Sequence, residues 1–422
     1  MSSDLSSVLV AGIGGFGALH LAALRDLEKR GVARLAAAAD PALARLRREC
    51  PEVGELARRD IPLFEDFEAL LRAKGADCDF AVISAPIAVH APLHRACVEA
   101  GVPVYMEKPP TLDLEELEGM ITCDKRLARR TQVGFNYIHQ PERQRWKKRL
   151  LNGEFGRLLR VGFYGYGARP ESYYARAGWS GGLMSGDSLV LDSCLSNAMA
   201  HHLHNILFIA GWGDVLSWAM PVSFESELYR TNDIESADTM FVRGCLENDV
   251  ELRVAATHAT GEKGVCVEEA VCENACLVFE RPGRFRIEWS DGRVEREEAP
   301  AGTGYHLERN LTYFADYVGG RRDLPLTRLE DSRPFVRSVG MAFLASGGIR
   351  TIPGSFIRRI SDGNGSHVRM ISGVEEAGRA LREHGRLPSE AGFGWASEGD
   401  KAEAGDPHDL RSWVAEQSTA FR

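Results

Sequence analysis

Short apolar runs alternate with amphipathic stretches through the first third of the chain. Apolar runs bounded by turn residues predict buried strands, and leucines at helical spacing predict helices between them. The predicted strands span residues 8–11, 35–39, 80–84, 102–106 and 131–135, and predicted helices follow residue 17 and span 91–100 and 114–127. Alternating strands and helices indicate an α/β fold, a parallel Rossmann sheet with helices on both faces, over residues 1–136.

The hydrophobic pattern changes after residue 136. Residues 158–166 alternate as a half-exposed strand, residues 203–210 form a hydrophobic helix, and residues 223–296 hold a series of short β-like runs. Such runs are typical of an antiparallel sheet. Helices are predicted again at 307–318 and 332–346, and a further strand and helix within 369–384. We therefore predict an α+β second domain with a largely antiparallel open sheet over residues 137–398, followed by a frayed polar tail, 399–422.

Length and charge restrict the class of protein. A chain of 422 residues exceeds one ordinary core, and 44% hydrophobic and 26% charged residues are usual for a soluble protein. A net charge of −9 argues against nucleic-acid and anionic-membrane partners, which require clustered Lys and Arg. No run is long enough to span a membrane, and the polar start lacks the basic residues of a signal peptide.

The nine cysteines are scattered and include no Cys-x-x-Cys pair. An odd number of isolated cysteines in a large chain suits reduced thiols and a cytoplasmic location. Cys266, Cys272 and Cys276 match no zinc spacing. His201 could bind a metal together with His204 or His202, but no third ligand stands at a recognisable spacing. We predict no metal site.

Glycines follow the first predicted strand in the order Gly12-x-Gly14-x-x-Gly17 and precede a predicted helix. Glycine permits a tight turn and close backbone approach, so a pyrophosphate can bind at the helix N-terminus. The alternative is a glycine-rich turn without a ligand. Because the strand and helix stand where the motif requires them, we predict dinucleotide contacts from Gly12, Ile13, Gly14, Gly15, Phe16 and Gly17.

Asp40 ends the second predicted strand, 23 residues after Gly17. A carboxylate there accepts hydrogen bonds from the ribose hydroxyls and repels a 2′-phosphate, which favours NAD over NADP. Two alternatives stay open at this point. Asp40 can instead form a turn before Pro41, and Arg45, Arg47 and Arg48 can instead help to bind a phosphate.

Two further predicted strands end in residues suited to a ligand. Ser84-Ala85-Pro86 leave room for a cofactor, while His90 suits an ordinary position in the first helical turn better than a catalytic one. The apolar run 102–106 stops at Glu107-Lys108-Pro109-Pro110. Ligands bind at the carboxyl ends of parallel strands, where Lys108 can stabilise negative charge on a substrate oxygen.

Asn197 and His201 are four residues apart in a predicted helix and therefore share one face. A histidine near neutral pKa is a natural general base for a hydroxyl proton. The alternative is that these histidines only fill gaps in packing. Tyr137 and Trp179 are candidate substrate contacts and are equally suited to packing.

Together these residues make the chain resemble the Gfo/Idh/MocA family of oxidoreductases, the glucose–fructose oxidoreductase and inositol dehydrogenase family. The resemblance rests on an ordered set of motifs: the glycine loop, Ala85-Pro86 with His90, Glu107-Lys108-Pro109, Gly134-Phe135-Asn136, and His201 ten residues before Gly211. By this resemblance, Ser84, Ala85, Pro86, His90, Glu107, Lys108 and Asn136 are further cofactor-binding positions.

The resemblance implies an NAD(P)-dependent dehydrogenase acting on a sugar, polyol or related small molecule. Lys108 would then hydrogen-bond the reacting oxygen, and His201 would exchange its proton. The chain departs from the family at Asn197, where an aspartate is frequent, and at Ile87, where asparagine is common. Two alternatives are a cofactor-binding sensor or scaffold without turnover and a redox-assisted, NAD-dependent glycoside hydrolase; a methyltransferase would not need Lys108. An open sheet offers a flat interface, so we expect a homodimer or homotetramer.

Overall fold

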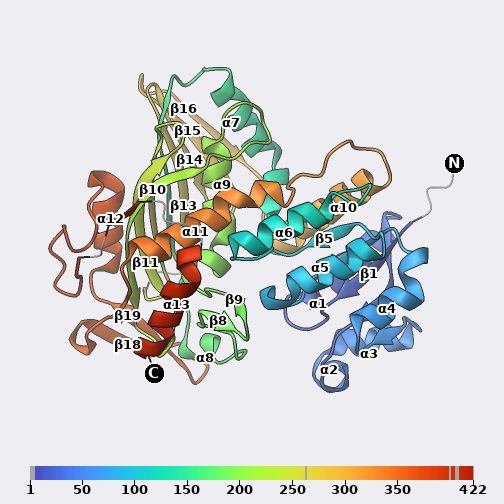
Figure 1. Ribbon diagram of the computed structural model, residues 1–422. Coiled ribbons are helices and arrows are strands. Elements are labelled where there is room, and N and C mark those ends of the chain that lie inside the picture. Colours follow the sequence, from blue (N-terminus) through green and yellow to red (C-terminus); the bar gives the residue numbers. More distant parts are fainter. Residues whose placement is uncertain (1–4, 262–263, 399–400, 404–407, 422) are drawn as a thin grey trace. The chain divides into compact units, whose positions relative to one another are not determined.

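The computed structural model describes residues 5–261, 264–398, 401–403 and 408–421 (Figure 1). The chain forms two compact units. The first unit contains the N-terminal residues up to 111, residues 115–139 and residues 301–332, and the second contains residues 112–114, 140–300 and 333–422. The sequence-based boundary at residue 136 stays a prediction, but the first unit also includes a segment that returns from far along the chain.

The first unit is built on a six-stranded sheet in the order β3-β2-β1-β4-β5-β6, with every pair parallel. This is the order of the Rossmann fold, so the predicted architecture is confirmed. The strands are β1 (Ser6–Ala11), β2 (Ala33–Ala39), β3 (Leu63–Phe64), β4 (Phe80–Ile83), β5 (Val104–Met106) and β6 (Gln132–Val133).

Helices of the first unit are α1 (Gly17–Lys29), α2 (Leu43–Glu49), α3 (Pro51–Arg58), α4 (Phe67–Lys74), α5 (His90–Glu99), α6 (Leu114–Asp124) and α10 (Thr303–Val318). Helix α10 packs against α1, and its Leu307, Leu311 and Phe314 are fully buried in the same core as the strands. Hydrophobic burial therefore draws a distant helix onto the Rossmann sheet. The three short helices between residues 43 and 74 are additional to the predicted elements.

The second unit is built on a mixed sheet in the order β16-β15-β14-β13-β7-β12-β11-β10-β17, with β20 beside β10. Only the β12–β7 and β10–β17 pairs are parallel among the described residues, so the sheet is largely antiparallel, as predicted. Its strands are β7 (Leu158–Tyr166), β10 (Pro221–Arg230), β11 (Thr239–Leu246), β12 (Glu251–Thr257), β13 (Val265–Cys272), β14 (Ala275–Glu280), β15 (Arg284–Trp289), β16 (Val294–Glu298), β17 (Ile349–Thr351) and β20 (Lys401–Glu403). Two short hairpins join β8 (Met184–Ser185) to β9 (Ser188–Leu189), and β18 (Ile357–Ser361) to β19 (His367–Ile371).

Helices cover both faces of this sheet (Figure 1). Helices α9 (Ala200–Ala210) and α11 (Arg333–Ala345) pack on one face, and α12 (Val374–His384) packs on the other, over β7, β11 and β12. Trp395 and Leu381 close a hydrophobic core beneath α12. The flat open face that suggested a homo-oligomer is thus covered over its central strands. The unit also contains α7 (Pro141–Leu151) and α8 (Glu171–Tyr174).

Two predicted elements differ from the structure. The predicted polar tail contains helix α13 (His408–Phe421), because Leu410 and Val414 lie one turn apart and are buried; residues 399–400, 404–407 and 422 of that tail lie outside the described residues. The helix expected to carry both Asn197 and His201 is broken: Cys194–Ala198 form a π-helical turn and α9 begins at Ala200.

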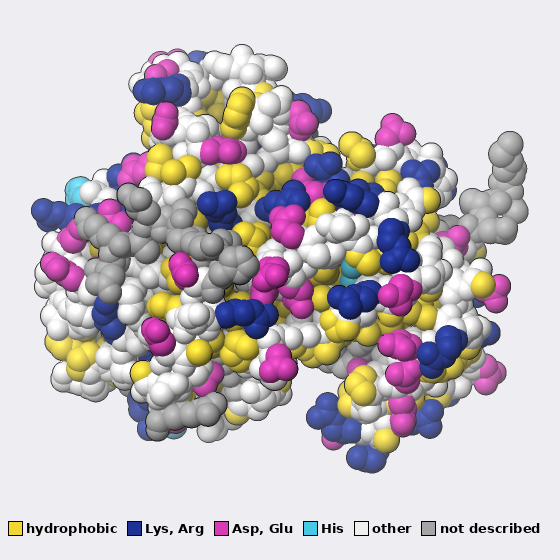
Figure 2. Space-filling model, in the orientation of Figure 1, with side chains coloured by type: hydrophobic (Ala, Val, Ile, Leu, Met, Phe, Trp, Pro, Cys, Tyr) yellow, Lys and Arg dark blue, Asp and Glu magenta, His cyan; other side chains and the backbone are white. Residues whose placement is uncertain are grey.

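Within the described residues, no helix has both the length and the apolar character needed to cross a membrane. The face shown in Figure 2 mixes Lys and Arg with Asp and Glu, so it presents no broad region of a single charge.

Candidate active site

Three strand ends of the first unit are held in register at one edge of the sheet. Ala11, Ile83 and Met106 are paired neighbours at the carboxyl ends of β1, β4 and β5. The residues that follow continue the pattern, because Ser84 N donates to Ala11 O and Glu107 N donates to Ile83 O, both at 2.8 Å. The predicted cofactor residues from three separate motifs are therefore brought together at the edge where ligands bind.

The glycine loop has the close approaches that its motif predicts. A Cβ on Gly12 would lie 2.8 Å from Ala85 N, and Gly12 has a φ of +89°. A Cβ on Gly17 would lie 2.3 Å from Gly12 O, at the point where α1 begins. Neither glycine can be replaced without moving backbone. Gly15 has a φ of +57° and nothing within 4 Å of a Cβ, and Phe16 is exposed, so this part of the loop faces open space.

Asp40 follows β2 and ties the glycine loop to that strand. Its Oδ2 accepts hydrogen bonds from Ile13 N at 2.9 Å and Gly14 N at 3.3 Å, and its Oδ1 accepts from Ala42 N at 2.8 Å. The last contact is the turn expected before Pro41, so the turn-forming and loop-supporting roles coexist. Asp40 is only partly buried, which leaves lone pairs for ribose hydroxyls. Arg45, one of the arginines that could instead help to bind a phosphate, is exposed, and its Nε lies 3.7 Å from Glu49 Oε2.

Ser84 and His90 lock neighbouring loops together. Ser84 Oγ donates to Gly12 O at 2.8 Å. His90 is buried, with Nδ1 3.0 Å from Pro109 O and Nε2 2.8 Å from Ala85 O. Burial lowers the pKa of His90. Its ring therefore bridges the loops after β4 and β5, a positioning role, while Ala85 and Pro86 remain accessible at the edge.

The residues after β5 are a carboxylate that contacts α1 and a lysine. Glu107 is buried, with Oε1 2.9 Å from Nε2 of His20 in α1 and Oε2 accepting from Lys108 N at 3.3 Å. Lys108 is partly exposed between buried Glu107 and buried Pro109, and the Lys108–Pro109 peptide is cis. Lys108 thus directly follows a carboxylate that is anchored to the helix of the glycine loop.

Asn136 and Tyr137 follow β6 in a short 3₁₀ turn. Asn136 is buried, and its Oδ1 accepts a 2.8 Å hydrogen bond from the Tyr105 hydroxyl. The Tyr137 ring packs edge-on against His306, with ring centroids 4.7 Å apart. The structure gives both side chains packing partners, and it gives the half-buried Trp179 a cation–π contact with Arg176, 4.9 Å from the ring centroid.

In the second unit, a strained residue precedes the segment that carries Asn197 and His201. Leu191 is fully buried at a φ of +38°, an unfavourable conformation for a branched side chain. The next residue, Asp192, is buried and accepts from Asn197 Nδ2 at 2.7 Å and from Gly181 N at 2.7 Å. The Asp192 carboxylate is therefore hydrogen-bonded directly to Asn197, a contact that the sequence motif did not reveal.

His201 differs from its neighbours in α9. It is partly exposed, whereas every residue from His202 to Ala210 is buried. His202 faces inward, with Nδ1 2.6 Å from Glu268 Oε1 and its ring stacked on Phe163. Among the three histidines of this helix, the exposure favours His201 as the one that meets a dehydrogenase substrate, because His202 is buried and held by Glu268.

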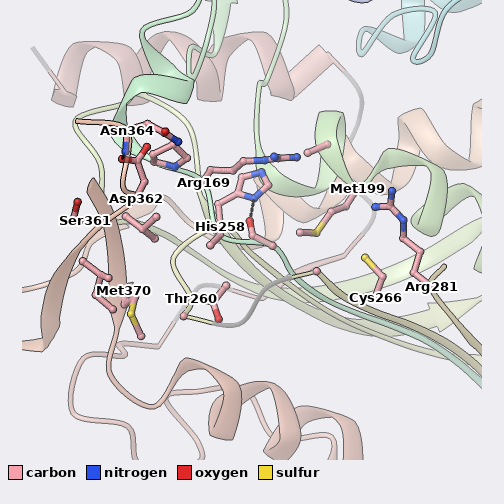
Figure 3. Close-up of a pocket in the computed structure, with 18 of the residues that line it drawn as sticks. Arg169, Met199, His258, Thr260, Cys266, Arg281, Ser361, Asp362, Asn364 and Met370 are labelled. Atoms are coloured by element: carbon pink, nitrogen blue, oxygen red, sulfur yellow. Dashed lines mark hydrogen bonds between the residues drawn. The ribbon is translucent and has the colours of Figure 1, made fainter. Parts of the chain in front are cut away.

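A cavity of about 640 Å³ in the second unit lies beside Ala198 and Met199 and was not predicted (Figure 3). Its lining includes Arg169, His258, Cys266, Arg281 and Asp362. Arg169 and His258 follow β7 and β12, which pair in parallel up to Tyr166 and Thr257. Cavity residues thus again follow carboxyl ends of parallel strands. The signal was missed because the sequence alone did not show that these two strands are parallel.

His258 is held neutral within this cavity wall. Its Nδ1 donates to Gly167 O at 2.8 Å, and burial lowers its pKa to about 3. A neutral ring with one nitrogen already bonded offers a single further hydrogen bond to the cavity.

Comparison with known proteins bears on these observations. Residues 6–135 match the model of the oxidoreductase family with an NAD-binding Rossmann fold. Inositol 2-dehydrogenase of Corynebacterium glutamicum is 27% identical over 281 residues, which cover 63% of this chain and 74% of that protein. Inositol 2-dehydrogenase 4 of Saccharopolyspora erythraea is 33% identical over 163 residues, 38% of this chain and 45% of that protein.

Solved structures show the same fold over both units. The WlbA dehydrogenase of Bordetella pertussis, in complex with NADH and UDP-GlcNAcA, superposes with a TM-score of 0.63 at 18% identity, covering 81% of this chain and 96% of that one. A nicotinamide dinucleotide fits the residues of the first unit: the glycine loop permits close approach, Gly15 faces open space, and Asp40 presents a carboxylate. Residues 6–135 therefore belong to the Gfo/Idh/MocA family of NAD-binding oxidoreductases.

Proposed function

We propose that this oxidoreductase oxidises a secondary hydroxyl of a polyol or sugar, with Lys108 and His201 acting on the reacting oxygen. The observation that carries the proposal is the register of the strand ends, which sets Lys108 on the same sheet edge as the glycine loop. The names of the sequence relatives, inositol 2-dehydrogenases, support a polyol as substrate.

Lys108 would donate a hydrogen bond to the substrate oxygen and stabilise the negative charge that develops there. The bound nicotinamide would accept hydride from the adjoining carbon. Glu107 fixes the Lys108 backbone and is itself anchored on His20, so the amine is carried by a rigid strand end rather than a mobile loop.

His201 would accept the hydroxyl proton as general base. Asn197 holds its amide nitrogen on Asp192, so its carbonyl oxygen is turned away from that carboxylate. We infer that this oxygen accepts a hydrogen bond from the substrate or from the imidazole. Asp192 would then orient the imidazole through Asn197, in place of the aspartate that the family often has at the position of Asn197.

NAD reduction with a panel of inositols, other polyols and sugars tests the proposal. Lys108→Met should lower kcat by about 100-fold or more, because an electrostatic donor to the reacting oxygen is worth roughly 10²–10³ in rate. Exposed Lys125→Met is the matched control and should keep full activity. His201→Gln should lower kcat by about 10²–10⁴-fold, whereas exposed His384→Gln should not.

The outcomes separate the alternatives. A variant of Lys108 or His201 that retains turnover would remove that residue from the mechanism. Tight NAD binding without reduction across the panel would favour a sensor or scaffold. Product release from a glycoside without net NADH would favour a redox-assisted hydrolase.

We also propose NAD rather than NADP as the preferred cofactor. Asp40 presents a carboxylate at the end of β2, and a negative charge there repels a 2′-phosphate. Thermal shifts with the four nicotinamide nucleotides test this preference, since a ligand that binds only the native state raises its apparent stability.

We propose a homodimer or homotetramer in the cytoplasm. All nine cysteines are unpaired, which suits a reducing compartment. Because α12 covers the central strands of the larger sheet, self-association would have to use the outer strands β14 to β16 or another surface. Light scattering coupled to size-exclusion chromatography gives the oligomeric state.

A further inference from the structure

A cysteine, a histidine and a glutamate form a connected group in the wall of the cavity. Cys266 and Glu268 are two residues apart on β13 and share a face of that strand, and His202 reaches them from α9. Glu268 Oε1 lies 2.6 Å from His202 Nδ1, and the His202 ring hydrogen-bonds the Cys266 thiol. With Nδ1 held by Glu268, the nitrogen that faces sulfur is Nε2. This is the nucleophile–base–orienter order of cysteine-dependent enzymes.

The carboxylate end of the group is fixed by two more buried side chains. Glu268 Oε2 accepts from Arg143 Nη1 at 2.6 Å, and Oε1 accepts from Asn205 Nδ2 at 2.8 Å. Arg143 is almost wholly buried and its guanidinium also lies over the Phe279 ring. The imidazole that faces Cys266 therefore cannot rotate freely, and Glu268 stabilises a positive charge on it.

The charges around the thiol favour its ionised form. Burial opposes ionisation of Cys266, but His202 outweighs burial and, with Arg281, lowers its pKa. Burial likewise opposes a charge on His202, but Cys266 and Glu268 raise its pKa to about 9. Cys272, a buried thiol on the same strand with no histidine beside it, has its pKa raised to about 12. The two cysteines are a matched pair that differ in surroundings.

The cavity gives Cys266 both access and a preference for anions. Cys266 is 8% exposed and lines the cavity together with His202 and Arg281, and Figure 3 shows Cys266 near Arg281 and Met199. Arg169 lines another part of the wall. A volume of about 640 Å³ is that of a small-molecule site. Two guanidinium groups, against one carboxylate in the described lining (Asp362), favour a carboxylate-bearing reagent.

We propose that Cys266 is a nucleophilic thiolate, activated by His202 and Glu268, that is thiolated by anionic low-molecular-weight disulfides. The Cys266 sulfur attacks one sulfur of the disulfide, a new S–S bond forms and the old S–S bond breaks. The second half of the reagent leaves as a thiolate, so the disulfide is reduced to one free thiol while Cys266 is oxidised to a mixed disulfide. The proposal does not rest on the proposed dehydrogenase reaction.

Oxidised glutathione is the probe, with each cysteine followed by mass spectrometry of peptides from the full-length protein at pH 6.5. Cys266 should form the adduct at least tenfold faster than Cys272. Cys266→Ser should remove the fast adduct, and the matched Cys272→Ser should leave it unchanged. Adduct formation at Cys266 no faster than at Cys272, or a fast adduct on another cysteine, would overturn the proposal.

The pH profile of alkylation by iodoacetamide separates activation from simple exposure. Wild-type Cys266 should keep its rate well below the ordinary thiol pKa of about 8.5. His202→Gln and Glu268→Gln should shift the profile upward, with native folding checked by thermal melting. The same profile in both variants and the wild type would show that Cys266 is reactive without the group, against the proposal.

Iodoacetate should react faster with Cys266 than iodoacetamide if the two arginines select anions; the reverse order would refute that selection.

Discussion

Asn197 donates a 2.7 Å hydrogen bond from its amide nitrogen to Oδ1 of the buried Asp192. A carboxylate only accepts hydrogen bonds, so this contact sets which end of the Asn197 amide faces outward. Arg176 lies 3.3 Å from Asp192 Oδ2 and Gly181 N donates to the same atom. Asp192 follows the strained Leu191, and its contacts hold Asn197 in a fixed orientation close to His201 in the sequence.

Replacing Asp192 by asparagine should disturb catalysis without affecting cofactor binding. The variant keeps the side-chain volume but allows the Asn197 amide to turn over. We expect kcat for polyol oxidation to fall by roughly 10- to 100-fold, since a displaced group near the reaction can cost about 100-fold. Steady-state kinetics and NAD titration measure the two effects. Exposed Asp187→Asn is the control, and an unchanged kcat in Asp192→Asn would exclude the support role.

Replacing Asp40 by serine should weaken NAD binding and relax the choice of cofactor. A hydrogen bond to a charged group is worth about 1.5–3 kcal/mol, so we expect the Kd for NAD to rise by roughly 10- to 100-fold. The Kd for NADP should rise much less or fall, because the repulsive charge is gone. Titration of both cofactors gives the ratio. Glu49→Gln, a charge loss on the neighbouring exposed helix, should leave the ratio unchanged.

The sequence predicted the first unit well because its signals are local. Buried parallel strands are continuous apolar runs, and the glycines after β1 have a steric requirement that Gly12 and Gly17 display. The return of α10 could not be predicted in the same way. Its amphipathic pattern shows a helix with one apolar face but does not identify α1 as the surface that the face covers.

The site in the second unit was predicted less completely. Asn197 and His201 were predicted to share one helix because they are four residues apart, but Asn197 lies in a π-helical turn and His201 in α9. Nothing in the pattern indicated the positive φ at Leu191. His258 and Cys266 were missed as cavity residues because their meeting depends on the parallel β7–β12 pair and on the β7–β13 register. Strand order is a long-range property that alternation of residues does not encode.

His258 should make the folded protein sensitive to acid. Its pKa is about 3 in the folded state and about 6.5 when unfolded, so the unfolded state binds more protons between these values. The contribution to stability is complete above pH 6.5 and is lost as the pH falls toward 3. We expect wild type to lose about 2 kcal/mol more than His258→Gln between pH 6.5 and 5. Urea unfolding at both pH values tests this, with His384→Gln as the exposed control; parallel losses in wild type and His258→Gln would contradict it.

Lys147 should make the protein more stable as the pH rises, the opposite of an ordinary surface lysine. Its Nζ is fully buried and donates to Phe208 O at 2.6 Å and to Gly211 O, the carbonyls at the end of the helix that carries His201. Burial lowers its pKa from 10.5 to about 7, so between these values the unfolded state binds the extra proton and stability increases with pH.

Lys147→Met should therefore be less stable than wild type, because the buried carbonyls lose their donor at a cost of about 1–3 kcal/mol each. The deficit should grow by about 2 kcal/mol between pH 7.5 and 9, since only the wild type gains stability over that range. Lys148→Met, at the next and exposed position, is the matched control and should track the wild type. A deficit that stays constant or shrinks with pH would mean that the folded protein keeps Lys147 charged, with the helix-end carbonyls holding an ammonium rather than an amine.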